Sequence, residues 1–221
     1  IGDRLEAYAA ALVAHFLKIP IAHYGGGTLT NGALDNFYRY NISNLSNLHF
    51  ATTKKNYNRL LDNTLIKSNV NFTGSTAIDG IVAYKKKANQ NYPNSSKNYY
   101  KSNKYILMTF HPVTGAKESI PDIMESVINF IFDLNTYSIL ITYPNNDDGY
   151  EEILKVIYKY EKYNRVKIVK SLGSERYYEA IQNCLFIIGN SSSGIIEAPY
   201  FNKTIINIGS RQSGRDKDNL I

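Results

Sequence analysis

Four polar turns in the second half of the chain each follow an apolar stretch that predicts a β-strand. They contain His111, Asn145, Ser191 and Arg211. Ligands of an open parallel sheet sit beyond the carboxyl ends of its strands, so we expect the four turns to line one crevice. Hydroxyl, amide, imidazole and guanidinium groups gathered in such a crevice suit a negatively charged ligand such as a diphosphate.

The turn at residues 189–194, which reads Gly-Asn-Ser-Ser-Ser-Gly, carries the strongest local signal. It separates a predicted strand from a predicted helix. Small residues let backbone N–H groups and the hydroxyls of Ser191 and Ser192 approach an anion, and the positive end of the helix favours a phosphate there. Glu197, one turn inside the helix, can hydrogen-bond the hydroxyls of a ribose. The alternative, equally good on spacing alone, is that the serines cap the helix and Glu197 is solvated.

Arginine and histidine supply two further candidates. Arg211 and Arg215 lie four residues apart in a glycine-flanked loop after a predicted strand. The planar guanidinium fork suits bidentate phosphate contacts, although such a loop taken alone is more often simply basic. His111 leaves its strand before Pro112 and can meet a phosphate or transfer a proton near neutral pH. The alternative for His111 is a loop residue that only makes hydrogen bonds.

Strands and helices alternate along the chain and must position these turns. Short apolar stretches predict strands, and the longer segments between them predict helices. This order predicts an α/β fold with parallel sheets covered by helices on both faces. The expected strands are residues 19–22, 48–52, 70–74, 105–110, 138–142, 166–170, 185–188 and 204–208, and the expected helices are 5–17, 33–45, 54–65, 119–134, 150–163, 175–182 and 194–201.

A stretch rich in lysine, asparagine and serine, residues 86–104, lacks an apolar period and predicts a linker or surface segment. It separates an amino-terminal lobe, residues 1–85, from a carboxy-terminal lobe, residues 105–221. The first lobe looks incomplete, because its first helix directly follows Asp3 and Arg4, where a strand is expected. The chain stops at Ile221 without a closing helix, so we expect truncation at both ends.

Composition excludes several classes of protein. Of 221 residues, 43% are hydrophobic and 20% are charged, which excludes general disorder. Cys184 is the only cysteine, which excludes a disulfide framework, and no apolar stretch approaches the ~20 residues of a membrane span. We therefore expect a soluble, cytoplasmic protein. A net charge of +6 and 19 tyrosines leave a nucleic-acid partner open, but many lysines fall in the expected linker, which disfavours it.

Taken together, these motifs resemble those of the hydrolysing UDP-N-acetylglucosamine 2-epimerases of sialic-acid-type pathways. The match runs over almost the whole chain, with motifs in the same order and at near-equal spacing. In the second half they are His111-Pro112-Val113-Thr114, Pro144-Asn145, Gly189-Asn190-Ser191-Ser192 with Gly194 and Glu197, and Ile206-Asn207-Ile208-Gly209 with Arg211-Gln212 and Gly214-Arg215. In the first half they are Gly2-Asp3-Arg4, His23 with a glycine loop, Gly32-Ala33-Leu34-Asp35 with Arg39, and Leu48-His49-Phe50.

The resemblance implies two Rossmann-like lobes, similar to those of glycosyltransferase-B-like enzymes, with a UDP-sugar bound between them. It implies anti elimination of UDP to a 2-acetamidoglycal, then hydration with inversion at carbon 2, which releases an N-acetylmannosamine-type sugar. It implies no metal or redox cofactor, and a homodimer or homotetramer at full length. The implied catalytic residues are Asp3, Asp35 and His111, and the implied substrate-binding residues are Arg4, Arg39, Asn145, Ser191, Ser192, Glu197 and Arg211.

One departure from the family pattern bears on activity. Relatives usually have a glutamate in the loop after the histidine, in a pattern like His-x-Glu-Gly-Gly-Glu or His-x-His-Gly-Gly-Glu, whereas residues 23–28 here read His-Tyr-Gly-Gly-Gly-Thr. No carboxylate occurs between Glu6 and Asp35. Loss of a catalytic acid or base typically costs on the order of 10² to 10⁴ in rate. A catalytically impaired UDP-sugar-binding homologue and a glycosyltransferase of the same fold therefore stay open, as does helix capping for Asp3 and Asp35.

Overall fold

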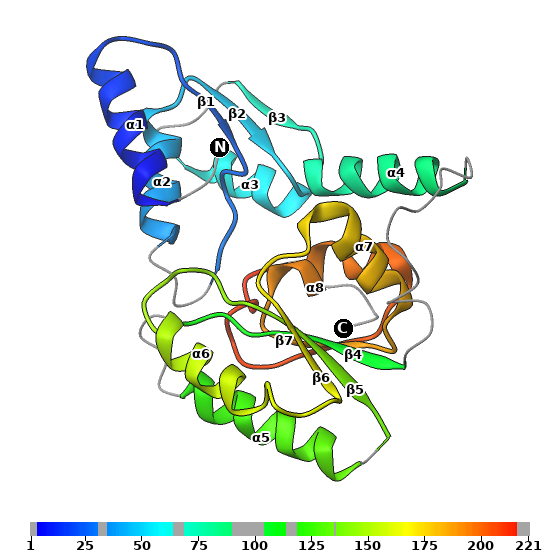
Figure 1. The fold of residues 1–221 in the computed structure, drawn as a ribbon. Coiled ribbons are helices and arrows are strands. Elements are labelled where there is room, and N and C mark those ends of the chain that lie inside the picture. Colours follow the sequence, from blue (N-terminus) through cyan, green and yellow to red (C-terminus); the bar gives the residue numbers. More distant parts are fainter. Residues whose placement is uncertain are drawn as a thin grey trace. The chain divides into compact units, whose positions relative to one another are not determined.

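The structure, a computed structural model, describes residues 4–30, 35–63, 69–89, 104–113, 119–134 and 136–215. These residues form two compact units. One runs up to Thr76 and includes residues 213–215, and the other is Ala77–Gln212. Each unit has its own parallel sheet (Figure 1), which confirms the expected α/β class. No helix in the described ranges is long and apolar enough to cross a membrane.

The first unit is built on a three-stranded parallel sheet in the order β1-β2-β3. His23 of β1 lies opposite His49 of β2, and both side chains are buried. A small apolar core contains Ala51 and Leu60. The elements are α1 (Leu5–Phe16), β1 (Ala22–Tyr24), α2 (Asp35–Leu45), β2 (Leu48–Ala51), α3 (Lys54–Asp62) and β3 (Val70–Phe72).

The second unit is built on a five-stranded parallel sheet in the order β6-β5-β4-β7-β8. Strands β4 and β5 are buried on both faces, which is why they read as continuous apolar runs. Helices α5 and α6 cover one face and α7 covers the other (Figure 1). The elements are α4 (Thr76–Asn89), β4 (Tyr105–Thr109), α5 (Ile120–Asp133), β5 (Ser138–Thr142), α6 (Tyr150–Lys159), β6 (Val166–Val169), α7 (Gly173–Asn183), β7 (Ile187–Gly189), α8 (Ser192–Ile196), the 3-10 helix η1 (Ala198–Phe201) and β8 (Ile205–Asn207).

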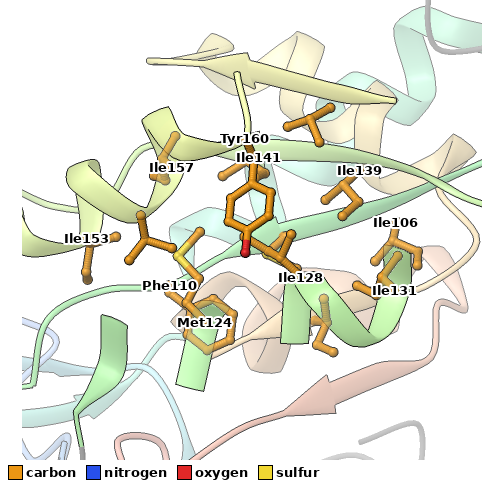
Figure 2. Packing of buried hydrophobic residues seen from close by; sticks show 14 of the residues in the cluster. Ile106, Phe110, Met124, Ile128, Ile131, Ile139, Ile141, Ile153, Ile157 and Tyr160 are labelled. Carbon is orange, nitrogen blue, oxygen red and sulfur yellow. The ribbon is translucent and has the colours of Figure 1, made fainter. Parts of the chain in front are cut away.

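Alternate residues of β4 supply core side chains to both faces of this sheet. Ile106 and Met108 belong to the cluster formed with α5 and α6, which contribute Met124 and Ile153 (Figure 2). Leu107 belongs to the cluster on the opposite face, which includes residues of α7. Burial of one such side chain contributes on the order of 1.5–3 kcal/mol. The two core layers hold the strands, and therefore the turns at their ends, in fixed positions.

The first strand lies later in the chain than the sequence predicts. The expected strand is residues 19–22, but β1 spans Ala22–Tyr24. Pro20 has no backbone N–H and cannot donate to a strand ladder. The carbonyl of Ile21 accepts the backbone N–H groups of Asn47 and Leu48, and the ladder runs on from there to the glycine loop.

The helix after the serine turn is shorter than the sequence predicts. One helix is expected over residues 194–201, but α8 ends at Ile196 and η1 follows it. Pro199 explains this break, because it lacks the N–H that would bond to the carbonyl of Ile195.

The sequence analysis predicts no helix between residues 74 and 86 and expects a linker from residue 86, but the structure has α4 over Thr76–Asn89. Ile81 is buried in the core of the second unit beside Tyr178, and Lys87 pairs with Glu175 of α7 at 2.9 Å. Residues 90–103 lie outside the described ranges. The lobe boundaries expected at residues 85 and 105 stay a prediction.

Candidate functional site

A cavity of about 470 Å³ lies in the second unit, beyond the carboxyl ends of its strands. Its lining includes one residue from each of the four polar turns: His111 after β4, Asn145 after β5, Ser191 after β7 and Arg211 after β8. Parallel strands bring these turns to the same edge of the sheet. The expected convergence is therefore present, and it gathers imidazole, amide, hydroxyl and guanidinium groups around one space.

His111 is held by hydrogen bonds at both ring nitrogens. Its Nδ1 accepts the backbone N–H of Asn145 at 3.0 Å, so the ring proton of the neutral imidazole lies on Nε2. Nε2 is 3.3 Å from Ser191 Oγ. Burial, and next the charge of Arg211, lower the pKa of His111 to about 4. At neutral pH the side chain is therefore an uncharged donor directed at Ser191.

Asn190, which the sequence analysis did not select as a site residue, joins three of the turns. Its side chain accepts the backbone N–H of His111 at 2.6 Å and donates to the carbonyl of His111 at 2.8 Å. Its own carbonyl accepts from Arg211 at 3.3 Å and from Gln212 at 2.9 Å. A buried amide bonded in this way fixes the spacing of the turns. The sequence analysis places Asn190 in the motif Gly189-Asn190-Ser191-Ser192 but assigns it no role.

Gly189 allows the serine turn to approach β4 closely. Its φ is +141°, and a Cβ there would lie 2.0 Å from the carbonyl oxygen of Thr109, so only glycine fits. Thr109 Oγ1 lies 2.5 Å from Thr142 Oγ1, and both threonines line the cavity. Sequence reasoning missed these two residues because threonine is common in strands for reasons unrelated to binding.

The serine turn places three hydroxyl groups at the cavity. Ser191 caps α8 by accepting the backbone N–H of Ser193, and the two Oγ atoms are 3.1 Å apart. Ser191 therefore caps the helix, as one interpretation of the sequence predicts, and also lines the cavity with Ser192. Because α8 has only five residues, few peptide dipoles align there, and the positive helix end invoked from the sequence is weak.

Glu197 follows α8 and lies at the cavity with its carboxyl group largely buried. Burial raises the pKa of Glu197 to about 7. A half-buried carboxyl group at the cavity does not fit the interpretation of Glu197 as a fully solvated side chain. A carboxyl group with this pKa can accept or donate a hydrogen bond near neutral pH, which suits a ligand hydroxyl.

Positive charge reaches the cavity from two strand ends. Arg211 lies after β8, and Lys170 lies after β6. Tyr177 of α7 also lines the cavity, and burial raises its pKa to about 12. Sequence reasoning missed Lys170 and Tyr177, because a lysine that ends a strand and a tyrosine within a helix give no distinctive pattern. The two cations favour an anionic ligand.

Two candidates of the first unit, Arg4 and Asp35, lie at the starts of helices. Arg4 is exposed at the N-cap position of α1, and Asp35 is the first residue of α2. A carboxylate at the start of a helix interacts favourably with the helix dipole, so the capping interpretation stays open for Asp35. Asp3 lies outside the described residues.

Arg39 is buried in the first unit with 2% of its surface exposed. Its guanidinium donates to the carbonyl of Thr28 and to Asn36 Oδ1, each at 2.7 Å. Burial, and next the charge of Arg215, lower the pKa of Arg39 to about 10. The guanidinium stays protonated at neutral pH and brings a fixed positive charge to the glycine loop.

The glycine loop is held without a carboxylate. A Cβ at Gly27 would lie 2.3 Å from the carbonyl oxygen of Asn56, and the φ of Gly27 is +76°. Thr28 stands where the family pattern has its second glutamate, and it is buried. Its Oγ1 donates to the carbonyl of Gly25 and accepts from Asn56 Nδ2, each at 3.0 Å. These bonds fix the loop in a form that has no acidic side chain.

Comparisons with known proteins agree on one family. The family model for UDP-N-acetylglucosamine 2-epimerase matches residues 1–221. The chain is 35% identical over 222 residues to UDP-N,N'-diacetylbacillosamine 2-epimerase (hydrolyzing) of Legionella pneumophila, and 32% identical over 218 residues to UDP-N-acetylglucosamine 2-epimerase of Neisseria meningitidis serogroup B. These matches cover 100% and 97% of this chain but 58% and 55% of the relatives. The chain therefore spans little more than half of their length.

Two solved structures share the fold. The UDP-GlcNAc 2-epimerase of Methanocaldococcus jannaschii, in complex with UDP-GlcNAc and UDP, superimposes with a TM-score of 0.78 at 21% identity, over 96% of this chain and 60% of that one. The S. aureus MnaA-UDP co-structure superimposes with a TM-score of 0.77 at 23% identity, over 95% of this chain and 56% of that one. Both agree with an α/β fold of parallel sheets and helices.

Proposed function

The chain belongs to the UDP-N-acetylglucosamine 2-epimerase family, and on this premise we propose that the whole protein is a hydrolysing 2-epimerase acting on a UDP-2-acetamido sugar. The observation that carries the proposal is the cavity at which His111, Asn145, Ser191 and Arg211 meet. The hydrolysing type is supported by the Legionella pneumophila relative, whose name states that reaction. A UDP-N-acetylglucosamine or UDP-N,N'-diacetylbacillosamine substrate fits this family equally well.

The proposed reaction has two steps, each balanced without a cofactor. A base removes the proton from C2 of the sugar, the bond between C1 and the diphosphate oxygen breaks on the opposite face, and UDP leaves with the electron pair. The product is a 2-acetamidoglycal. Water then adds across the C1–C2 double bond, with hydroxyl to C1 and a proton to C2 from the face opposite to the first. UDP and the free 2-epimer are released.

The cavity residues suit the diphosphate and the ribose. Ser191, Ser192 and the backbone N–H groups of the serine turn donate to phosphate oxygens, and Arg211 adds positive charge where the leaving group gains negative charge. Asn145 also lines the cavity and contributes a further amide donor. Glu197 accepts from ribose hydroxyls. All of these contacts favour UDP as a leaving group.

His111 acts in this proposal as a neutral donor. Both of its ring nitrogens are engaged, by the Asn145 N–H and by Ser191 Oγ, and its pKa is about 4. An ionised imidazolium is therefore disfavoured near neutral pH. We assign His111 to stabilisation of the departing diphosphate, directly or through Ser191, and assign proton transfer at C2 to carboxylates.

The carboxylates of this proposal are Asp3 and Asp35, with Arg4 and Arg39 beside the substrate. Removal of a weakly acidic C2 proton and its replacement on the opposite face require two proton-transfer groups, or one group and a water. In the first unit the buried guanidinium of Arg39 brings a fixed positive charge to the glycine loop. A homodimer or homotetramer is proposed for the whole protein, which light scattering would check.

A catalytically impaired UDP-sugar-binding protein is the second candidate. The observation that favours it is the glycine loop, in which Thr28 is buried and bonded to Asn56 at the position of a family glutamate. The UDP cavity of the second unit does not depend on this loop. Binding of UDP without turnover is the outcome expected from this candidate.

One experiment separates the candidates. The full-length protein is incubated with UDP-N-acetylglucosamine and, separately, with UDP-N,N'-diacetylbacillosamine in D₂O, and the products are followed by NMR. The first candidate gives UDP and a free 2-epimer with deuterium at C2, and Asp35→Asn lowers turnover by on the order of 10² or more while UDP binding persists. UDP binding without any product supports the second candidate. Sugar transfer to an added acceptor would instead indicate a glycosyltransferase, and a protein that binds no UDP would contradict all three.

A further inference from the structure

A chain of hydroxyl groups leads from the interior of the second unit to the serine turn. Tyr177 Oη of α7 is 2.5 Å from Ser193 Oγ. Thr109 also lines the cavity near Tyr177, and its Oγ1 is 2.5 Å from Thr142 Oγ1. Burial raises the pKa of Tyr177 to about 12, so its phenol keeps its proton under ordinary conditions.

The direction of each hydrogen bond determines what these hydroxyl groups can donate to a ligand. Each of these hydroxyls has one proton to donate and lone pairs with which to accept. A phosphate oxygen only accepts. Ser193 can therefore donate its proton to a phosphate and still satisfy its lone pairs only if a neighbour donates to it, and Tyr177 Oη is placed to do so.

Ser191, another serine of the turn that lines the cavity, has a donor of its own in His111. Asn145 donates its backbone N–H to His111 Nδ1, which leaves the proton on Nε2 to be donated to Ser191 Oγ. Without a ligand, one serine satisfies the other, since their Oγ atoms are 3.1 Å apart. With an anion present, both serine protons can turn to it, because His111 and Tyr177 supply the donors that the serines then need.

We propose that Tyr177 is a positioning residue that directs the hydroxyl proton of Ser193 at the diphosphate of a bound nucleotide, as the counterpart of His111 at Ser191. This inference rests on the proposed binding of UDP in the cavity. It adds Tyr177, a half-buried residue of helix α7, to the recognition of the diphosphate, and it assigns this role to the hydroxyl group and not to the aromatic ring.

The test uses the full-length protein and four variants: Tyr177→Phe, Ser193→Ala, the double variant, and Tyr178→Phe. Tyr178 is the matched control, because it is the next residue of α7 and its hydroxyl bonds to the carbonyl of Ala77, away from the cavity. UDP affinity is measured by calorimetry, and the ³¹P spectrum of bound UDP is recorded. Thermal midpoints show whether each variant is folded.

Tyr177→Phe is expected to weaken UDP binding about three- to ten-fold, the range for one hydrogen bond, and to shift a ³¹P resonance of bound UDP. Tyr178→Phe should change neither. If Tyr177 acts through Ser193, the double variant binds UDP no more weakly than Ser193→Ala alone. Ser193→Ala should also weaken UDP binding, and unchanged affinity in that variant would overturn the inference even should Tyr177→Phe fold poorly.

Two results would overturn the inference while the proposed function stands: unchanged UDP affinity and ³¹P shifts in Tyr177→Phe, or losses that simply add in the double variant. Absence of UDP binding in the unaltered protein would overturn the proposed function and this inference with it. The unaltered protein thus separates failure of the site from failure of the role assigned to Tyr177.

Discussion

Nδ1 of His111 accepts the backbone N–H of Asn145 at 3.0 Å, which joins the turn after β4 to the turn after β5. This single bond decides which ring nitrogen carries the proton. It leaves Nε2 as the donor toward Ser191, and it orients the ring at the cavity wall. Two turns that lie 34 residues apart in the sequence are thereby coupled at the candidate site.

His111→Ala is expected to weaken UDP binding by about ten-fold or more. The change leaves the Asn145 N–H without its acceptor and Ser191 without its donor, and an unsatisfied buried group costs about 1–3 kcal/mol. Calorimetry at pH 7.5 measures the effect. His15→Ala, at the exposed end of α1, is the control and should bind UDP as the unaltered protein does. Equal affinities for both variants would contradict a role for His111 at the diphosphate.

The pKa of His111 also predicts how stability depends on pH. Folding lowers this pKa from 6.5 to about 4, so the folded state binds fewer protons than the unfolded state between these values. The contribution to stability is complete above pH 6.5 and is lost as the pH falls toward 4. His111→Gln cannot take up this proton, so its free energy of unfolding should fall less over that window, by on the order of 1–3 kcal/mol. The free energies of unfolding of both proteins are measured in urea at pH 7, 5.5 and 4.5. An equal fall in His111→Gln and in the unaltered protein would refute this role of His111.

Glu197 predicts a pH dependence of the opposite sign. Burial raises its pKa from 4.5 to about 7, so the folded state binds more protons than the unfolded state between these values. The cost of ionising Glu197 is absent below pH 4.5 and complete above pH 7. Glu197→Gln should therefore gain stability relative to the unaltered protein at pH 8 and little at pH 4.5. Glu161→Gln, at an exposed position, is the control, and a Glu197→Gln difference that does not vary with pH would disprove this cause.

Two glycines of the loop after β1 offer a matched test of close packing. Gly25 and Gly27 both have positive φ, +87° and +76°, but a Cβ at Gly25 meets open space whereas one at Gly27 would lie 2.3 Å from the carbonyl oxygen of Asn56. Gly25→Ala should cost about 1–2 kcal/mol through the backbone alone. Gly27→Ala should cost at least about 2 kcal/mol more, because backbone must move. Chemical denaturation of both variants decides this, and equal losses would show that the contact with Asn56 is not limiting.

The local pattern of apolar and polar residues was enough to predict the strands of the second sheet and the polar turns that follow them. Strands β4 and β5 are buried on both faces, so their residues had to be apolar throughout, and a turn after such a strand is visible as the point where polarity returns. The first strand was predicted at residues 19–22 but lies at Ala22–Tyr24, because the apolar residues on both sides of Pro20 look alike in sequence. Pro20 has no N–H to donate, so the strand ladder begins after it. The partner in this ladder is β2, which lies more than 20 residues later in the sequence.

The site was only partly visible in the sequence. His111, Ser191 and Arg211 were found because they follow the ends of predicted strands and are residue types that bind anions. Asn190 and Tyr177 were missed, since what makes them important is a partner that is distant in sequence: Asn190 bonds to residue 111, and Tyr177 reaches the serine turn from a neighbouring helix.

Sequence by itself determined the α/β class, the order of the strands and of the helices other than α4, and the residue types offered at each strand end, because apolar period and turn composition are properties of short segments. The tertiary structure alone decided which protons and lone pairs face one another: the tautomer of His111, the raised pKa of Glu197 and the donor behind Ser193. Hydrogen bonds act over about 3 Å and burial depends on every neighbour, so these properties exist only after distant segments have been packed together.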